Sequence, residues 1–258
     1  LPFRLDHVNI YLIEDGDGWC VLDAGIWDQR TIDLWEAVLA GPLAGSRLTR
    51  LIVTHHHPDH IGLAGWLCRR AEIPLLTSQT AYLACANLSL APGSPQDRQF
   101  HDFYINHGTT REVADQMGTH GLDYLRMVSP LPNTFLRLLS RDMITIGARR
   151  FRILTGDGHA PEQVMLYCDE DQLFFPADQV IAKISPNVSV WPNEPDGDPL
   201  GHFVRTARRI RDNLPDDVLV LPGHQLPFTG LHARCSELVE HHDRRCDLIG
   251  EAVRAGPM

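Results

Sequence analysis

One short segment constrains this chain more than any other feature: His55-His56-His57-Pro58-Asp59-His60, which lies between the apolar runs 51–54 and 61–67. Imidazole nitrogens and a carboxylate at such close spacing are ligands that divalent transition metals, zinc above all, prefer in proteins. Alternate residues of an extended segment point to the same side, so His55 and His57 can share one ion and His56 turns away. Asp59 and His60 can then face a second ion where a helix begins. A solvated histidine-rich loop is the alternative.

Three later residues favour the metal site over the solvated loop, because each follows a strand-like run. His159 lies in a glycine-rich turn after the run 150–154. Asp178 ends the run 173–177, and His224 follows the run 218–222. Strand ends are places where rigid elements hold site residues in fixed positions.

The chain resembles the metallo-β-lactamase-fold superfamily of metal-dependent hydrolases in the order of its candidate ligands: His55, His57, Asp59, His60, His159, Asp178 and His224. Asp23, in the turn Asp23-Ala24-Gly25, also resembles the Asp-x-Gly turn near the amino terminus of that family. The resemblance covers most of the chain. The His-x-His-x-Asp-His form is similar to glyoxalase II-like thioesterases and lactonases more than to secreted β-lactamases.

The resemblance implies a fold and a ligand set. The fold is α/β in the broad sense that includes α+β folds. It is a four-layer αβ/βα sandwich with two mixed sheets face to face. Asp178 would bridge two metal ions, with Asp59 and Asp178 taking part in catalysis and Asp23 orienting a ligand histidine. The two ions would be held by separate groups: His55, His57 and His159 for one, and Asp59, His60 and His224 for the other.

The chemistry of such a centre predicts a hydrolase. A water shared by two divalent ions loses its proton near neutral pH, and the same ions polarise a carbonyl, so no serine or cysteine nucleophile is needed. We expect zinc, with iron or manganese as alternatives, and a small ester, thioester or lactone as substrate. The alternatives are a mononuclear iron sulfur dioxygenase, which would use chiefly His55, His57, His159 or His224, and Asp178, and a phosphodiesterase or nuclease of the same fold.

Composition limits the partners. The chain has 258 residues, 43% of them hydrophobic, which fits a single domain over 1–258. Its formal net charge of −10 is unfavourable for binding nucleic acid or an anionic membrane, so we expect a small-molecule substrate. The six cysteines form no Cys-x-x-Cys pair, and no apolar run is long enough to span a bilayer. These features favour small buried thiols and a cytoplasmic location.

Two segments are candidates for the walls of a substrate site. Residues 90–132 interrupt the strand series and predict a helical insertion, with helices over 96–106 and 110–117, that serves as a cap over the site or as a surface for a homodimer. Its Tyr104 is a candidate substrate contact. The proline-stiffened loop 183–193 is a candidate wall, with Lys183 and Asn187 as its polar contacts.

Local signals predict several helices. Asp28 is a candidate N-cap for a helix that ends at Gly41, and Ser78 for a later one. A single helix is predicted over 61–70, directly after the histidine segment. Two more are predicted over 199–213 and 231–253, the first with an apolar stripe that includes Phe203 and Ile210.

Overall fold

A computed structural model describes residues 5–90, 95–117 and 120–256. Two five-stranded sheets lie at its centre, and both are mixed, as the sequence predicted. The first sheet has the order β1-β2-β3-β4-β5, with β1 Tyr11–Asp15, β2 Gly18–Leu22, β3 Arg47–Ile52, β4 Leu75–Thr77 and β5 Leu136–Arg137. The second has the order β10-β9-β8-β7-β6, with β6 Met143–Ile146, β7 Arg149–Gly156, β8 Gln163–Cys168, β9 Leu173–Ala177 and β10 Leu219–Pro222.

Strand directions bring the candidate site residues to one edge of each sheet. In the first sheet β2, β3 and β4 are parallel, so the segments after β2 and β3 leave the sheet at the same edge. In the second sheet β9 and β10 are parallel, and β7 runs in their direction because two antiparallel pairings separate it from β9. The chain therefore places Asp178, His159 and His224 at a common edge.

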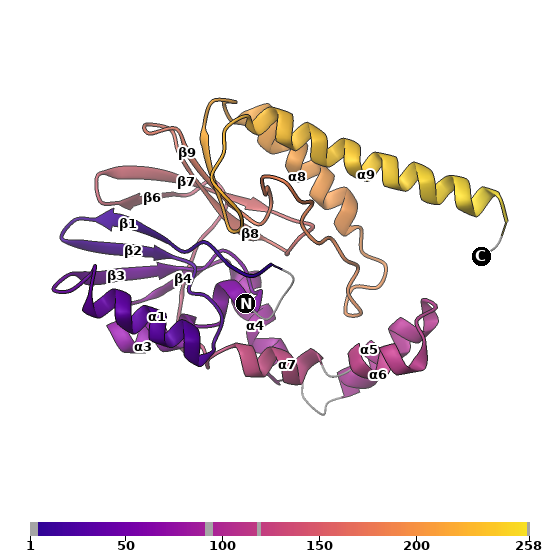
Figure 1. Cartoon of the computed structure of the whole chain (residues 1–258), viewed down its shortest axis with the longest axis horizontal. Helices are drawn as coiled ribbons and strands as arrows, with labels where there is room; N and C mark the ends of the chain where they lie inside the picture. Colours follow the sequence, from indigo (N-terminus) through magenta and orange to yellow (C-terminus); the bar gives the residue numbers. More distant parts are fainter. Residues whose placement is uncertain (1–4, 91–94, 118–119, 257–258) are drawn as a thin grey trace.

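The two sheets pack face to face through a buried apolar layer, and helices cover their outer faces (Figure 1). Ile52 and Leu76 from the first sheet meet Phe151, Leu166 and Phe175 from the second in this layer. Helices α1 Gln29–Ala40, α3 Ala64–Ala71, α4 Gln79–Leu90 and α7 His120–Met127 contribute to the core on the outside of the first sheet. Helices α8 Pro199–Asn213 and α9 Leu231–Arg254 pack on the second. The predicted four-layer sandwich is confirmed.

Several helix boundaries follow the local signals. Asp28 caps α1 by accepting a hydrogen bond from the Thr31 amide at 2.7 Å, and the helix ends before Gly41. Ser78 accepts a hydrogen bond from the Ala81 amide at 3.1 Å at the start of α4. Helix α8 has the predicted bounds and buries Phe203 and Ile210. These elements are local in origin, because one polar cap and one apolar stripe specify each of them.

The single helix predicted over 61–70 is wrong. The chain forms two pieces there, α2 Pro58–Ile61 and α3 Ala64–Ala71. The amide of Leu63 donates to the carbonyl of Gly25 at 2.8 Å, so it is not available for a hydrogen bond within the helix. The break therefore comes from a contact with the turn after β2, which local sequence does not reveal.

The segment 90–132 contains α5 Pro95–Asn106 and α6 Arg111–Met117, close to the two predicted helices, and the unpredicted α7. Gly121 lowers the helix propensity of α7, so its stability depends on packing. Tyr124 and Val128 are both buried in the same core as α3 and α4. That the segment is an insertion into an otherwise complete domain stays a prediction.

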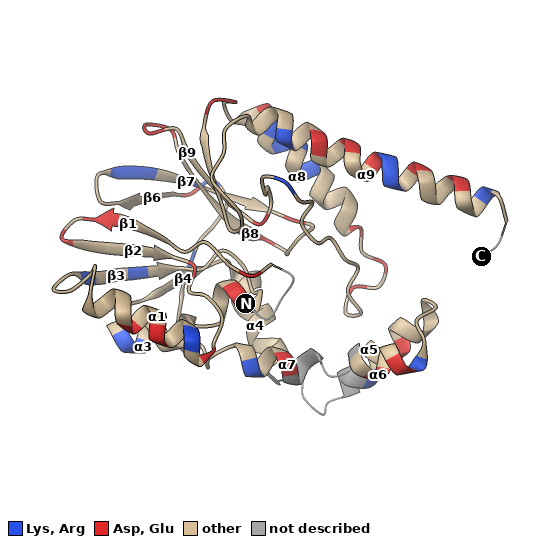
Figure 2. Ribbon diagram, viewed as in Figure 1, with Lys and Arg blue, Asp and Glu red and all other residues tan. Residues whose placement is uncertain are grey.

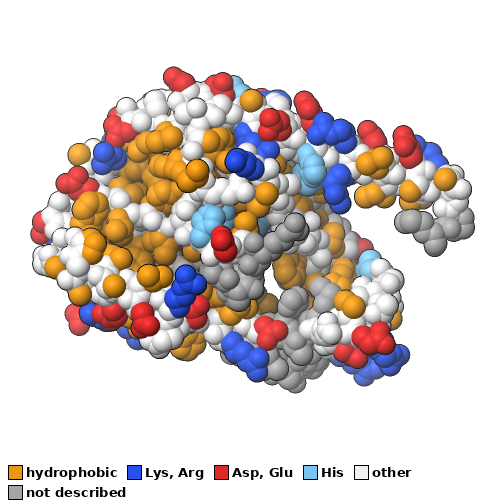
Figure 3. Space-filling model, in the orientation of Figure 1, with side chains coloured by type: hydrophobic (Ala, Val, Ile, Leu, Met, Phe, Trp, Pro, Cys, Tyr) orange, Lys and Arg blue, Asp and Glu red, His pale blue; other side chains and the backbone are white. Residues whose placement is uncertain are grey.

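Helix α9 extends beyond the body of the molecule (Figure 1). Its outer part carries the exposed hydrophobic side chains Leu248, Ile249 and Val253. Figure 3 shows hydrophobic side chains among charged ones along this outer part of the molecule. Arg side chains are interspersed with Asp and Glu along α9 (Figure 2). Among the residues described, no helix combines the length and hydropathy that crossing a membrane requires.

We expect Gly65→Ala to destabilise the protein by about 1–3 kcal/mol, the usual cost of overpacking. A Cβ at Gly65 would lie 1.9 Å from the Pro130 carbonyl oxygen, so the segment after α7 would have to move away from α3. Chemical denaturation measures the change in the free energy of unfolding.

Gly250→Ala is the matched control, because the nearest atom to its added Cβ is the Arg254 side chain at 3.6 Å. Inside α9 this change should stabilise the helix by about 0.5–1 kcal/mol. Equal effects of the two alanines would show that the close packing of α3 against the segment after α7 does not exist.

Candidate metal centre

The histidine segment follows β3 and enters α2, so it lies at the edge where the two sheets meet. The loops after β7, β9 and β10 reach the same place. Three groups of side chains there each bring their ligand atoms within 4.8 Å of one another: His55, His57 and His159; His55, His60 and Asp178; Asp59, His60 and His224. All seven predicted ligands thus come together, although 169 positions separate the first from the last (224 − 55).

The first group contains imidazoles from two loops. His55 Nε2 lies 2.9 Å from His57 Nδ1 and 3.3 Å from His159 Nε2. His55 and His57 reach the same side of the segment, as alternation predicted. Three ring nitrogens that face one another at these distances fit a cation between them.

The second group joins the start of α2 to the loop after β10. Asp59 Oδ2 lies 3.3 Å from His224 Nε2 and 3.8 Å from His60 Nε2. Asp59 and His60 are in the single turn of α2, where Pro58 occupies the first helical position. The turn directs both side chains inward, and both are buried.

Asp178 lies between the two groups. Its Oδ2 is 3.5 Å from His159 Nε2 of the first group. It is 3.4 Å from His60 Nε2 and 3.2 Å from His224 Nε2 of the second. A carboxylate with these neighbours on both sides has the position of a bridging ligand.

Hydrogen bonds outside the centre fix which nitrogen of each ring faces inward. His60 Nδ1 donates to Asp23 Oδ2 at 2.8 Å, His159 Nδ1 to the Asn187 carbonyl at 2.9 Å, and His224 Nδ1 to the His7 carbonyl at 2.6 Å. The Thr54 hydroxyl donates to Asp23, so His55 Nδ1 must donate to that hydroxyl, 2.9 Å away. Each of these four rings therefore directs its Nε2 toward the centre.

Two atoms at the centre confirm that the donor set fits a metal. Among the described residues, His60 Nε2 and Asp178 Oδ1 are buried without a hydrogen-bond partner. Buried polar atoms are normally paired, and leaving one unpaired costs about 1–3 kcal/mol. Four histidine Nε2 atoms, the His57 ring and two carboxylates match the ligand chemistry of zinc, iron or manganese.

The two groups of the site differ in electrostatics. Burial would lower the pKa of His60 and of His224, but Asp178 and Asp59 outweigh it and raise the pKa of His60 well above the ordinary value and that of His224 to about 9. Burial lowers the pKa of His55 and of His57 well below the ordinary value, and neighbouring imidazoles add to the shift. Both rings are therefore neutral at neutral pH. Burial alone would raise the pKa of Asp178, but His60, His224 and His159 together outweigh it and hold that pKa well below its usual range. The carboxylate is therefore ionised.

Asp23 also organises the chain around the centre. Its Oδ1 accepts a hydrogen bond from the Thr54 amide at 2.8 Å, and its Oδ2 one from the Thr54 hydroxyl at 2.9 Å. One carboxylate thus ties the turn after β2 to the first residue before the histidine segment and to His60. The sequence placed Asp23 beside a ligand histidine, and in the structure that histidine is His60.

The sequence missed the backbone groups that orient two rings, the carbonyls of His7 and Asn187. No side-chain pattern reveals a carbonyl, since every residue has one. Thr54 was also missed, although its position directly before His55 was a usable signal.

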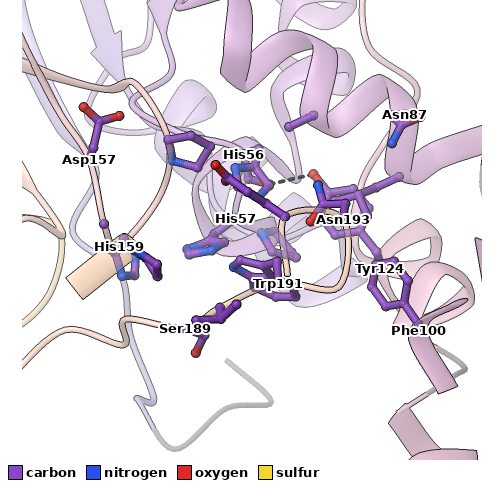
Figure 4. A pocket seen from close by; sticks show the side chains of 18 of the residues that line it. His56, His57, Asn87, Phe100, Tyr124, Asp157, His159, Ser189, Trp191 and Asn193 are labelled. Carbon is purple, nitrogen blue, oxygen red and sulfur yellow. Dashed lines mark hydrogen bonds between the residues drawn. The ribbon is translucent and has the colours of Figure 1, made fainter. Parts of the chain in front are cut away.

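A cavity of ≈ 440 Å³ opens beside the first group (Figure 4). It is lined by the histidine segment, the loop after β7, α4, α5, α7, the loop 189–194 and the start of α8. Its volume lies within the range of about 300–1,000 Å³ that is usual for small-molecule sites. His56, which no metal group among the described residues includes, is buried and lines this cavity.

Tyr104, Lys183 and Asn187, the predicted substrate contacts, are not among the described residues that line the cavity. The ring of Tyr104 lies against Phe103 on α5, with 5.3 Å between the ring centroids. Lys183 is exposed, and its amide donates to the side chain of Gln225. Asn187 is exposed and contributes its carbonyl to His159. The two segments predicted as walls do contribute to the lining. Which of their side chains point into the cavity depends on packing, which the sequence does not show.

The segment 90–132 does more than cover the cavity. The buried Tyr124 hydroxyl donates to the His56 carbonyl at 2.6 Å, a bond drawn in Figure 4. The Trp27 amide donates to the Met127 carbonyl at 3.0 Å, and the Ser129 amide to the Gly62 carbonyl at 2.7 Å. The end of this segment therefore holds the histidine segment and α2 in place.

The model of the metallo-beta-lactamase superfamily matches residues 3–224, and this chain belongs to that superfamily. The chain is similar to the "Probable metallo-hydrolase YqjP" of Bacillus subtilis (strain 168), with 23% identity over 281 aligned positions that cover 100% of this chain and 79% of YqjP.

Two solved structures have the same fold. A beta-lactamase domain protein from Burkholderia ambifaria has a TM-score of 0.91 and 34% sequence identity, and the match covers 100% of this chain and 74% of that one. TTHA1623, solved in a di-iron-bound form, has a TM-score of 0.61 and 22% identity, and covers 90% of this chain and 95% of its own. The fold is therefore that of the metallo-beta-lactamases, and its His and Asp groups are consistent with a dinuclear metal site.

We expect Tyr124→Phe to lower the free energy of unfolding by about 1–2 kcal/mol, because the His56 carbonyl loses its buried donor while the ring still fills its place. Tyr124→Ala should cost about 3–5 kcal/mol, since it also leaves a cavity. Urea denaturation of the two variants and the parent measures both values. If Tyr124→Phe is as stable as the parent, the hydroxyl does not hold the histidine segment.

Proposed function

We propose that this protein is a metal-dependent hydrolase that uses a dinuclear centre to cleave a small ester, thioester or lactone. One observation carries the proposal: Asp178 lies between two groups of inward-facing imidazoles, beside a cavity of small-molecule size. Membership of the superfamily and the likeness to YqjP support the hydrolase class.

In this proposal the ions take the ligands that the sequence assigned. His55, His57 and His159 would hold one ion, Asp59, His60 and His224 would hold the other, and Asp178, which lies between the two groups, would be shared by them. We favour zinc, because imidazole-rich sets with few carboxylates suit it well. Iron is the first alternative, since TTHA1623 has been solved with two irons on this fold, and manganese is the second.

When bound, two such ions supply an activated hydroxide and a polarised substrate carbonyl. The residues of the chain do the rest. Asp23, Asn187 and His7 hold three ligand rings in one orientation through their Nδ1 atoms. The cavity walls position the substrate carbonyl beside His57 and His159, which line both the cavity and the first group.

Asp178 and Asp59 are the carboxylates we assign to catalysis. Asp178 fixes the separation of the two groups. Asp59 has one oxygen 3.3 Å from His224, and its carboxylate is a candidate to accept a proton and pass it to the leaving group. The Tyr124 hydroxyl is engaged with the His56 carbonyl, so we do not assign it a proton-transfer role.

The proposed partner is a small molecule. A homodimer stays a prediction, for which the exposed hydrophobic side chains of outer α9 are a candidate contact. We also propose a cytoplasmic location, because the six cysteines are unpaired and five of them are buried. Unpaired buried thiols are usual in reducing compartments.

We expect Asp178→Ala to lose the two-metal state and to reduce kcat/KM by more than about 100-fold. Mutation of residues that only orient the ligands already costs up to about 100-fold, and loss of a ligand should cost more. A methyl group cannot bridge two ions. Metal analysis of the purified protein and hydrolysis of a panel of thioesters, lactones and phosphodiesters measure the two effects.

His56→Ala is the matched control for metal content, because His56 is in the same segment but in none of the described metal groups. It should retain two ions per chain. Equal metal content in both variants would contradict the ligand assignment. Oxygen uptake during turnover would instead indicate the sulfur dioxygenase.

Metal should also stabilise the fold, because it binds atoms that lack partners without it. Free zinc at about 1,000 times its Kd should add about 4 kcal/mol to the free energy of unfolding. For a chain of this size that corresponds to a rise in Tm of roughly 10 °C. Thermal melts with a chelator and with added zinc measure it, and an unchanged Tm would argue against a metal centre.

A further inference from the structure

The side chains that line the cavity beside the candidate metal centre restrict the charge of the substrate that it can bind. Apolar side chains from the helices and the loop 189–194 form much of the lining: Leu88, Phe100, Tyr124, Met127, Val190 and Trp191. The carbonyl oxygen of Pro192 accepts a hydrogen bond from the Gln99 side chain at 3.3 Å, which joins α5 to the loop across the cavity. The lining therefore comes from helices and from the loop 189–194, which this hydrogen bond connects.

Charged side chains in the lining have one sign. Asp123, Asp157 and Glu194 line the cavity, and in the part of the chain that the structure describes no Lys or Arg does. The charge of Asp123 is partly offset by Arg126, 3.4 Å away. The other two acidic side chains of the lining are Asp157, whose Oδ1 accepts a hydrogen bond from the Glu162 amide at 2.8 Å, and the exposed Glu194. The Asp, Glu, Lys and Arg side chains of the described lining therefore sum to a negative charge.

The other polar groups in the lining are suited to uncharged partners. Asn87, Gln99 and Asn193 offer amides that donate and accept hydrogen bonds. His56 is 9% exposed, and its Nδ1 has no hydrogen-bond partner among the described residues. A buried ring nitrogen beside a cavity can bind a hydroxyl, amide or carbonyl of a ligand.

An anionic substituent would lose water on entering this cavity and would meet carboxylates, with no Lys or Arg among the described lining residues to compensate. Burial of an unpaired charge is among the most expensive events in molecular recognition. The scissile carbonyl would lie beside the metal ligands, so a substituent at the other end of the substrate would not itself coordinate the ions. A neutral or cationic substituent avoids this cost.

We propose that the enzyme selects substrates whose acyl portion is uncharged or cationic and rejects anionic ones, with Glu194 as a specificity-determining residue. This inference rests on the proposed function for its reaction. The substrate class is then a small, partly apolar ester, thioester or lactone that carries no carboxylate or phosphate away from the scissile bond.

The experiment uses the metal-loaded protein and acyl thioesters of equal chain length that end in a methyl group, a trimethylammonium group or a sulfonate. None of these ends competes strongly for the metal. The parent should hydrolyse the neutral and cationic compounds with kcat/KM at least about tenfold above the anionic one, the effect of one nearby charge. Glu194→Lys should reduce that preference about tenfold, and Glu194→Gln should reduce it less.

Asp196→Lys is the matched control, because Asp196 is an exposed carboxylate two positions away that does not line the cavity. It makes the same change in net charge and should leave the preference intact. Equal turnover of all three compounds by the parent, or an equal effect of the two lysine variants, would overturn the inference.

The two proposals can fail separately. If the parent hydrolyses none of these thioesters, nor the corresponding oxygen esters and lactones, the proposed reaction is wrong. Calorimetric binding of the corresponding amides, which cannot turn over readily, still decides the charge preference. Tighter binding of the neutral and cationic amides supports it, and equal or tighter binding of the sulfonate contradicts it.

Discussion

The carboxylate of Asp23 is the contact on which the rest of the site depends. It accepts hydrogen bonds from the Thr54 amide, the Thr54 hydroxyl and His60 Nδ1, and it is 2% exposed. Through it, the end of β2 determines where the histidine segment leaves β3 and which nitrogen of His60 faces the centre. Its backbone is in the left-handed region, with φ of 63°, as are Ala177 before Asp178 and Gln225 after His224, with φ of 49° and 66°. Such conformations cost on the order of 1–3 kcal/mol each, and the surrounding packing must hold them.

Much of the fold follows from local sequence, because caps and apolar stripes specify single elements. Asp28 and Ser78 begin their helices as expected, and α8 has the predicted bounds. The elements that could not be predicted depend on distant contacts. The break between α2 and α3 results from a hydrogen bond to Gly25. Helix α7 packs Tyr124 into the core, and Val128 is buried directly after the helix ends. Propensity describes a residue in isolation, whereas these segments obtain their stability from residues far away in the chain.

The site likewise has parts that the sequence predicts and parts that it does not. Its ligand residues were visible in the sequence because His, Asp and their spacing are rare in combination, and because strand ends have fixed positions. The contacts that orient them were not, since the His7 and Asn187 carbonyls have no sequence signature. The sequence predicted which segments contribute to the wall of the cavity, but not which of their side chains line it. Tyr104 and Phe100 lie one helical turn apart on α5, yet the described lining includes Phe100 and not Tyr104.

The attachment of α7 to the histidine segment has a consequence for local unfolding. The amide hydrogens of Trp27 and Ser129 are bound across the junction between the end of this helix, the turn after β2 and the end of α2, with the Tyr124 hydroxyl beside them. A motion that moves α7 away from the cavity must expose the amides of Trp27 and Ser129 to solvent. Their protons should then exchange with deuterium together, as one cooperative unit that includes the ligand loop, and ligand in the cavity should slow them as a set.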